Sequence, residues 1–220
     1  MKLGQHFLHN IFFISKFISY VNLDIKPIIE IGCGKGNITA YLNPDLCIEY
    51  DEKFTKYLKN FNLILGDARY LPAIRGQIVS SLPYYITKDF LKEIGKLNEI
   101  RRAVLILQKD VVDKLLEEPT YISFLINFVF KLQAKDTIPP NAFNPRPKVF
   151  SQIIIMDRIR QYASDIDEIL RCISNFKKKT LSHICRLCNL KCKDDINKRL
   201  EEFKPCRVIE LLHLLGINYV

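Results

Sequence analysis

The sequence predicts an α/β fold with a mostly parallel open sheet and helices on both of its faces. Two observations support this prediction. Short apolar runs of strand length alternate with helical patterns along the first two thirds of the chain, and a cluster of glycines follows the first run. The spacing between runs leaves room for the helical crossovers that parallel strands need, so ligands are expected at the carboxyl ends of the strands.

The first strand covers residues 27–31, an apolar run that stops at the glycine cluster 32–36. Apolar residues then recur at helical spacing, which predicts a short helix over 37–42 that packs back on the strand. Between residues 137 and 148, four prolines exclude a helix and predict an ordered loop. The same reasoning predicts strands over 46–50, 62–65, 77–80, 102–107 and 151–156, and helices over 53–59, 87–97 and 111–116.

After residue 158 the strand pattern stops. The tail instead predicts four short amphipathic helices, over 166–176, 181–190, 196–203 and 207–215. It carries a net charge of +5 in 63 residues (13 Lys and Arg against 8 Asp and Glu), whereas residues 1–157 carry +4. We therefore expect two domains, 1–157 with the sheet and 158–220 as a small, basic, C-terminal helical domain.

Composition narrows the class of protein. With 48% hydrophobic and 26% charged residues, the chain is neither disordered nor fibrous. A net charge of +9 favours a polyanionic partner such as nucleic acid. No run of about 18 uncharged apolar residues predicts a membrane span, and neither a secretory signal nor a disulfide framework is expected from this amino terminus and the seven cysteines. We expect a cytoplasmic monomer that does not bind membranes.

The glycine cluster predicts a cofactor loop. Gly32, Gly34 and Gly36 follow the pattern G-x-G-x-G, whereas a dinucleotide-binding loop needs a third glycine where this chain has Asn37. This Rossmann-like arrangement favours S-adenosylmethionine over a nicotinamide cofactor, because its amino-carboxylate can approach a backbone that lacks side chains.

Acidic residues follow the next two strands. Glu49 ends the second strand, 17 residues after Gly32, where a carboxylate can accept hydrogen bonds from both ribose hydroxyls. Asp67 follows the third strand, where it can accept a hydrogen bond from the adenine amino group. Three consecutive strand ends thus carry suitable groups in a suitable order, which predicts a cofactor pocket at this edge of the sheet.

The fourth strand ends in Ser81-Leu82-Pro83-Tyr84, where amino-methyltransferases carry Asn or Asp, any residue, Pro and Tyr. The adenine N6 is a poor nucleophile because its lone pair is conjugated into the ring. A side-chain oxygen and the next backbone carbonyl can hold its hydrogens and favour a tetrahedral nitrogen, while the aromatic ring stacks on the extruded base. We expect these four residues to carry the chemistry.

With this motif and four others, the chain resembles the ribosomal RNA adenine dimethyltransferases of the small subunit from residue 4 to residue 181. The resemblance implies methyl transfer from S-adenosylmethionine to N6 of two adjacent adenosines in the hairpin near the 3′ end of 16S rRNA, during subunit biogenesis. The other four motifs are Gly4-Gln5-His6-Phe7-Leu8, Leu107-Gln108-Lys109-Asp110, the proline-rich stretch 139–149 and Phe176-Lys177-Lys178-Lys179-Thr180-Leu181.

The resemblance also implies roles for single residues. Tyr84 and Phe143 would sandwich the target base; the alternative for Phe143 is a core anchor that fixes the proline-rich loop. The first domain would bind the cofactor and the second would contact RNA and the ribosome. Cofactor contacts are expected from His6, Leu8, Gly32, Gly34, Glu49, Asp67 and Ser81, and RNA phosphate contacts from Lys148, Lys177, Lys178 and Lys179.

Ser81 departs from the family, which has Asn at this position. A hydroxyl is shorter than a carboxamide and can donate as well as accept. Ser81 can reach N6 directly or through water with slower turnover, Ser80 and the Leu82 carbonyl can share the task, or the chain is a non-catalytic assembly factor that binds rRNA. A 23S rRNA adenine methyltransferase is a further alternative; those enzymes usually lack the Lys-Thr-Leu motif seen at 179–181. We expect slow catalysis.

Cysteines cluster in the tail. Cys185, Cys188 and Cys192 have helical spacing, with Cys172 and Cys206 nearby. With His183 also nearby, a metal site is one alternative. On one face of a helix such residues behave instead as small buried hydrophobes, so we expect no metal here.

Overall fold

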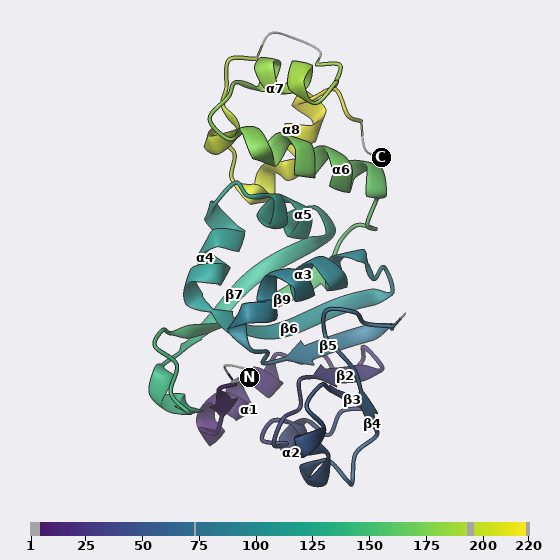
Figure 1. Cartoon of the computed structure of the whole chain (residues 1–220), viewed down its shortest axis with the longest axis vertical. Helices are drawn as coiled ribbons and strands as arrows, with labels where there is room; N and C mark the ends of the chain where they lie inside the picture. Colours follow the sequence, from purple (N-terminus) through teal and green to yellow (C-terminus); the bar gives the residue numbers. More distant parts are fainter. Residues whose placement is uncertain (1–4, 73, 193–195, 219–220) are drawn as a thin grey trace. The chain divides into compact units, whose positions relative to one another are not determined.

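A seven-stranded sheet forms the centre of the computed structural model, which describes residues 5–72, 74–192 and 196–218 (Figure 1). The strands of this sheet are β2 (Ile28–Ile31), β3 (Leu46–Glu49), β4 (Leu63–Leu65), β5 (Gly76–Ser80), β6 (Ile100–Gln108), β7 (Phe130–Ile138) and β9 (Ser151–Arg158). Their order is β4-β3-β2-β5-β6-β9-β7. Strands β2 to β6 run parallel and β9 runs antiparallel to β6, which confirms the predicted α/β fold.

The strand order reverses at β2, which has β3 on one side and β5 on the other. Such a switch point opens a crevice at the carboxyl ends of the strands, where ligands bind. The register aligns these ends, because Ile31 pairs with Ile48 of β3 and with Ser80 of β5. Gly32, Glu49 and Ser81 each follow one of these residues directly, so the pairing brings all three to one edge of the sheet.

Helices and 3₁₀ turns connect the strands. Asn10 begins the first helix, its side chain accepting a hydrogen bond from the Phe13 backbone. The helices are α1 (Ile11–Ser19), α2 (Thr39–Leu42), α3 (Thr87–Lys96), α4 (Lys109–Glu117), α5 (Tyr121–Val129), α6 (Ser164–Ile173), α7 (Leu181–Leu187) and α8 (Val208–Leu214). The 3₁₀ turns are η1 (Glu52–Tyr57), η2 (Tyr84–Ile86), η3 (Pro140–Ala142), η4 (Ser174–Phe176), η5 (Leu200–Glu202) and η6 (Pro205–Arg207). None of the described helices is long and apolar enough to cross a membrane.

A hydrophobic cluster covers one face of the sheet and joins α1 and α2 to the central strands. Ile14 and Phe17 of α1 pack in it with Val79 of β5 and Val104 of β6. The neighbouring Ile78 of β5 is also fully buried, and because side chains alternate along a strand it faces the opposite side. Both faces are therefore covered, as expected for parallel strands.

Two segments far apart in sequence form a second, two-stranded sheet. Strand β1 (Phe7–Leu8) pairs antiparallel with β8 (Phe143–Asn144), with Leu8 opposite Phe143. The amino-terminal motif is thereby held to the proline-rich loop, which contains this short strand as well as the expected irregular turns.

The chain divides into two compact units, Met1–Val112 with Leu132–Arg158, and Asp113–Lys131 with Ile159–Val220. The last transition lies at residue 158, where the sequence predicts a boundary, and residues 113–131 fall in the second, helical unit. The physical reason is that α5 is almost entirely apolar and buried, and its partners are α6 and α8 of the tail.

Inside the helical unit two predicted helices are shorter than expected. The helix predicted over 181–190 ends at Leu187, and that over 196–203 is reduced to the turn η5. Helix α7 stops because Asn189 adopts positive φ and the Leu190 N–H bonds back to the Cys185 carbonyl, which closes the last turn. Cys185, Cys188 and Cys192 therefore do not share one continuous helix. The structure instead joins Cys172 to Cys188 and Cys185 to Cys192 by disulfides, a correction to the expected free thiols.

Candidate cofactor pocket and catalytic loop

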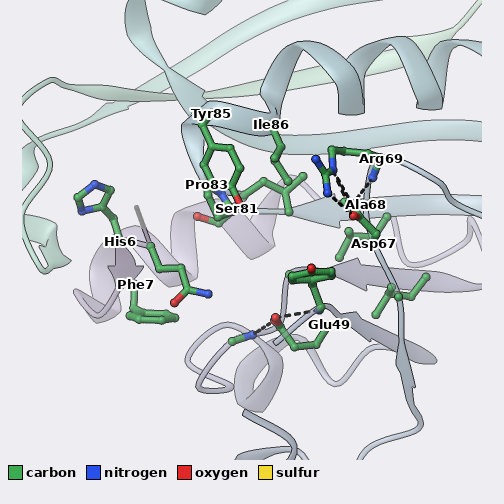
Figure 2. Close-up of a pocket in the computed structure, with 18 residues that line it drawn as sticks. His6, Phe7, Glu49, Asp67, Ala68, Arg69, Ser81, Pro83, Tyr85 and Ile86 are labelled. Carbon is green, nitrogen blue, oxygen red and sulfur yellow. Dashed lines mark hydrogen bonds and ion pairs between the residues drawn. The ribbon is translucent and has the colours of Figure 1, made fainter. Parts of the chain in front are cut away.

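A pocket with about 690 Å³ of empty space, which includes the part open to solvent, lies at the carboxyl ends of β2, β3 and β5 (Figure 2). The predicted residues His6, Gly32, Gly34, Glu49, Asp67 and Ser81 line it, together with Leu82 and Pro83. The fold thus brings together residues that stand up to 77 positions apart in the sequence, from His6 to Pro83.

The glycine loop needs its glycines for two reasons. Gly32, Gly34 and Gly36 all have positive φ, a conformation that L side chains rarely adopt. A Cβ atom at Gly32 would lie 2.8 Å from Leu82, and one at Gly34 would lie 2.7 Å from the Phe7 ring. The loop is therefore in close contact with the catalytic-motif segment on one side and with strand β1 on the other.

Glu49 is held in a fixed orientation by backbone donors. Its Oε2 accepts a hydrogen bond from the Gly34 N–H at 2.7 Å, and its Oε1 accepts from the N–H groups of Tyr50 and Asp51 at 2.9 Å each. The carboxylate is 5% exposed and borders the pocket (Figure 2). The carboxylate thus links the glycine loop to the end of β3. Because it is held at both oxygens, it is a rigid acceptor for a bound ligand.

Asp67 forms an ion pair that the sequence did not reveal. Arg69 donates from Nε and from a terminal nitrogen to the two Asp67 oxygens, with a shortest distance of 2.6 Å, and its backbone N–H also bonds to Oδ1 (Figure 2). The Arg69 side chain lowers the pKa of Asp67, which is therefore charged at neutral pH. Most of its acceptor capacity is already taken by Arg69, so a ligand amino group would share this carboxylate.

The Ser81-Leu82-Pro83 segment borders the pocket directly. Ser81 is half-buried and Leu82 is 7% exposed, packed against Gly32. The neighbouring Ser80 is buried and its hydroxyl donates to the Ile31 carbonyl at 2.7 Å. Ser80 therefore faces into the sheet, which argues against its sharing the task of Ser81.

Tyr84 lies beside the pocket without lining it. Its hydroxyl shares a hydrogen bond of 2.6 Å with the Ser151 hydroxyl, and burial raises its pKa. Its ring centre is 5.6 Å from that of His6. The His6 Nδ1 donates to the Pro145 carbonyl at 2.7 Å, since a carbonyl can only accept, so this nitrogen is not a free base.

Phe143 and Leu8 are buried against protein and do not border the main pocket. Phe143 is 2% exposed and belongs to the hydrophobic cluster under β1, so its ring faces are covered by protein in this structure. This packing favours the alternative of a core anchor over the expected base sandwich, because Phe143 pairs with Leu8 and both belong to this cluster. Leu8 borders only the smaller of two neighbouring cavities, of about 270 Å³, and not the main pocket.

Glu30 is a buried acid beneath the glycine loop. It lies in β2, is 2% exposed, and its Oε2 has no hydrogen-bond partner among the described residues. Burial raises the pKa of Glu30 to about 8; the Thr39 hydroxyl opposes this shift and the charge of Glu49 reinforces it. Glu30 is therefore mostly protonated at neutral pH.

The expected RNA contacts lie in different units. Lys148 is exposed in the first unit, and Lys178 and Lys179 are exposed in the second, with Lys177 half-buried. Gly4 of the amino-terminal motif lies outside the described residues, whereas Gln5 lines the pocket.

Several pocket residues were missed by sequence reasoning. Tyr50 and Arg69 line the pocket and stand one and two positions after the predicted acids Glu49 and Asp67. Their closeness to these acids in the sequence could have indicated them. Tyr85 rather than Tyr84 lines the pocket and is 60% exposed. Asn37, the residue at the missing third glycine, donates from its amide to the Leu8 carbonyl at 2.9 Å and so fastens β1 to the glycine loop.

Comparison with known proteins agrees with this geometry. Solved structures of similar fold include a dimethyladenosine transferase from Plasmodium falciparum, with a TM-score of 0.75, 20% identity and coverage of 98% of this chain and 100% of that one. The 23S rRNA methyltransferase ErmE has a TM-score of 0.73 and 16% identity, with coverage of 96% and 99%. These likenesses support the fold of an S-adenosylmethionine-dependent methyltransferase.

Sequence relatives are more specific. A ribosomal RNA small subunit methyltransferase A from Mesomycoplasma hyopneumoniae (strain 232) is 31% identical over 204 residues, covering 82% of this chain and 78% of the relative. A protein of the same name from Prochlorococcus marinus (strain MIT 9515) is 28% identical, covering 93% and 87%. The family model for ribosomal RNA adenine dimethylase matches residues 1–189. The chain belongs to the ribosomal RNA adenine dimethylase family.

Proposed function

We propose that this chain transfers methyl groups from S-adenosylmethionine to N6 of two adjacent adenosines in the hairpin near the 3′ end of small-subunit rRNA. Family membership supports the adenine dimethylation, and the names of the sequence relatives support the small subunit as substrate. The observation that carries the proposal is that the Ser81-Leu82-Pro83 segment borders the same pocket as Glu49 and Asp67.

The donors and acceptors of the pocket fit S-adenosylmethionine. Glu49 is a fixed carboxylate for the ribose hydroxyls, and Asp67 is an acceptor for the adenine amino group. Gly32 and Gly34 border the pocket without a side chain, so the loop backbone can approach the amino-carboxylate closely. When bound, the cofactor supplies a methyl group on a positively charged sulfur.

Residues of the catalytic segment would prepare the target amine. The Ser81 hydroxyl and the Leu82 carbonyl can each accept one N6 hydrogen, which directs the nitrogen lone pair toward the methyl group. Ser81 is shorter than the Asn of the family, so we expect slow transfer. The methylated amine can lose its proton to water, so no side chain is needed as a strong base.

The RNA is held by positive charge in this proposal. The chain carries a net +9, and exposed lysines at 148, 178 and 179 are suited to phosphate contacts, with Lys177 beside them. The helical tail would supply contacts to rRNA and the subunit, and the protein would act as a cytoplasmic monomer during subunit biogenesis.

The direct experiment measures transfer of labelled methyl groups from S-adenosylmethionine to small ribosomal subunits that lack the 3′-end modification. Identification of N6,N6-dimethyladenosine by mass spectrometry supports the proposal. Monomethyladenosine alone would limit the enzyme to a first transfer. No product despite cofactor binding would support a non-catalytic assembly factor. Methylated adenosine in 23S rRNA would mean that the substrate is the large-subunit rRNA.

Ser81→Asn restores the family residue at this position and tests what the serine does. If the hydroxyl is the weaker acceptor, the substitution increases the initial rate by about 10²-fold, the usual effect of one hydrogen bond made in the transition state. Ser81→Ala is the matched control and should lower the rate, since it removes the side-chain acceptor. Equal rates in all three proteins would mean that the residue at position 81 does not act on N6.

A further inference from the structure

Four cysteines of the helical unit converge from three parts of the chain. Cys172 is near the end of α6, Cys185 is in α7, Cys188 is at the end of α7, and Cys192 follows the turn after it. The Cα atoms of Cys172 and Cys188 lie 6.0 Å apart and those of Cys185 and Cys192 lie 6.1 Å apart. Because Cys185 and Cys188 are three residues apart on one helical turn, the two pairs are neighbours.

The local backbone builds this convergence. The Cys188 N–H still bonds to the Ile184 carbonyl, so it shares the helical face of Cys185. Asn189, at positive φ, then reverses the chain and directs Cys192 back toward Cys185. Gly216 supports the returning segment, since a Cβ at that position would lie 2.0 Å from the Lys191 carbonyl oxygen. The four sulfurs are thus held by secondary structure and packing.

The surrounding charge is suited to thiolates. Between residues 171 and 192 the chain has no Asp or Glu. Positive side chains close in the chain offset the net charge of −2 that Zn²⁺ has with four thiolates. Arg171 is already paired with Asp167, and the other cations of this segment are Lys177, Lys178, Lys179, Arg186 and Lys191.

We propose that Cys172, Cys185, Cys188 and Cys192 are the four ligands of a structural zinc ion, and that the disulfide-linked arrangement is the oxidised, metal-free form of the same site. The pattern C-x₁₂-C-x₂-C-x₃-C contains the close pair typical of zinc sites, and structural zinc is tetrahedral with four cysteine sulfurs. A phosphine reductant gives each disulfide two electrons and becomes the phosphine oxide, while water supplies the oxygen and the two protons. The four thiols then release four protons when Zn²⁺ binds.

Two physical arguments favour the zinc form over disulfides or free thiols. Among the described residues between 181 and 203, only α7 and η5 are helical, so a small unit of this kind gains from a metal cross-link. An enzyme of ribosomal subunits works where protein thiols stay reduced. This second argument rests on the proposed function, but zinc binding is measured without methyl transfer, so the two can fail separately.

The test uses the full chain purified with a phosphine reductant, without chelator, and incubated with zinc sulfate. After removal of excess metal, we expect one zinc per chain by mass spectrometry of the metal. Cys185→Ser and Cys192→Ser each remove one of four ligands and should each weaken zinc binding by about 100-fold, since each ligand contributes about a quarter of the binding free energy. Cys206→Ser is the matched control, because Cys206 is an exposed free cysteine of the same unit, and should leave the zinc content unchanged.

A measurement on the unmodified chain covers the case in which a variant does not fold. Zinc should protect the four cysteines, but not Cys206, from an alkylating reagent, as mapped by peptide mass spectrometry. Co²⁺ in place of zinc should give the strong visible absorption of a tetrahedral thiolate complex. Substoichiometric zinc in the reduced chain, equal alkylation of all five cysteines, or disulfides that persist in protein isolated from reducing cells would each overturn the proposal.

Discussion

Glu30 offers a test of the electrostatics beneath the glycine loop, by the substitution Glu30→Gln. Burial raises the pKa of Glu30 from an ordinary 4.5 to about 8 in the folded chain. Between these two pH values the folded protein holds a proton that the unfolded protein has released. Unfolding therefore releases a proton, and stability falls as the pH rises through this window.

The size of the effect follows from the same pKa shift. One proton difference changes the free energy of unfolding by about 1.4 kcal/mol per pH unit, or about 2.7 kcal/mol between pH 5.5 and 7.5. Glutamine has the shape of the protonated acid and does not titrate, so the variant loses this dependence. Relative to the original chain, Glu30→Gln should gain about 2.7 kcal/mol of stability over that pH interval.

The assay is urea unfolding of the ligand-free proteins at pH 5.5, 6.5 and 7.5, followed by circular dichroism. The difference between the two proteins cancels the titration of groups that they share. Glu52→Gln, at an exposed position, is the matched control and should run parallel to the original chain. A difference that stays constant within about 0.5 kcal/mol for Glu30→Gln would show that the buried acid is already ionised, and would refute the desolvation argument.

Three further substitutions test the pocket. An alanine in the left-handed conformation costs about 1–2 kcal/mol, and Gly34→Ala should lower stability by more than this because its Cβ would lie 2.7 Å from Phe7. Gly36→Ala is the control and should cost only the backbone strain, since its nearest contact would be at 3.6 Å. Equal losses of stability in thermal unfolding would contradict the steric argument. Asp67→Asn should weaken S-adenosylmethionine binding about tenfold in calorimetry, since one charged acceptor is lost, and an unchanged affinity would remove this residue from the cofactor site. Tyr84→Phe should lower stability by about 1 kcal/mol through its lost hydrogen bond but retain methyl transfer, so a large loss of activity at full stability would assign chemistry to the hydroxyl.

The sequence by itself determined the order of the strands β2 to β6 and β9 with the helices between them, and the groups at the strand ends, but it did not predict α1 or β7. Apolar runs and helical spacing are local properties, and parallel strands present their carboxyl ends at one edge. Gly32, Glu49, Asp67 and Ser81 could therefore be assigned to one pocket from their positions along the chain, and all four line it. The order of motifs along the chain also indicated the family correctly.

Tertiary structure decided what depends on packing between distant segments. An aromatic residue in a proline-rich loop can face solvent or the core, and only the pairing of β8 with β1 shows that Phe143 is buried. Asp67 follows a strand in the sequence, but only the folded turn shows that Arg69 binds its carboxylate through both backbone and side chain. The apolar helix α5 could have packed on the sheet, and its burial with α6 and α8 assigns it to the tail.

The cysteines show the same division most clearly. Their helical spacing predicted one buried face, but a single residue, Asn189, ends α7 and turns Cys192 back. Sequence patterns report which groups are available, because they depend on neighbours along the chain. Which groups meet depends on where helices stop and what packs against them, and this is set by the folded chain as a whole.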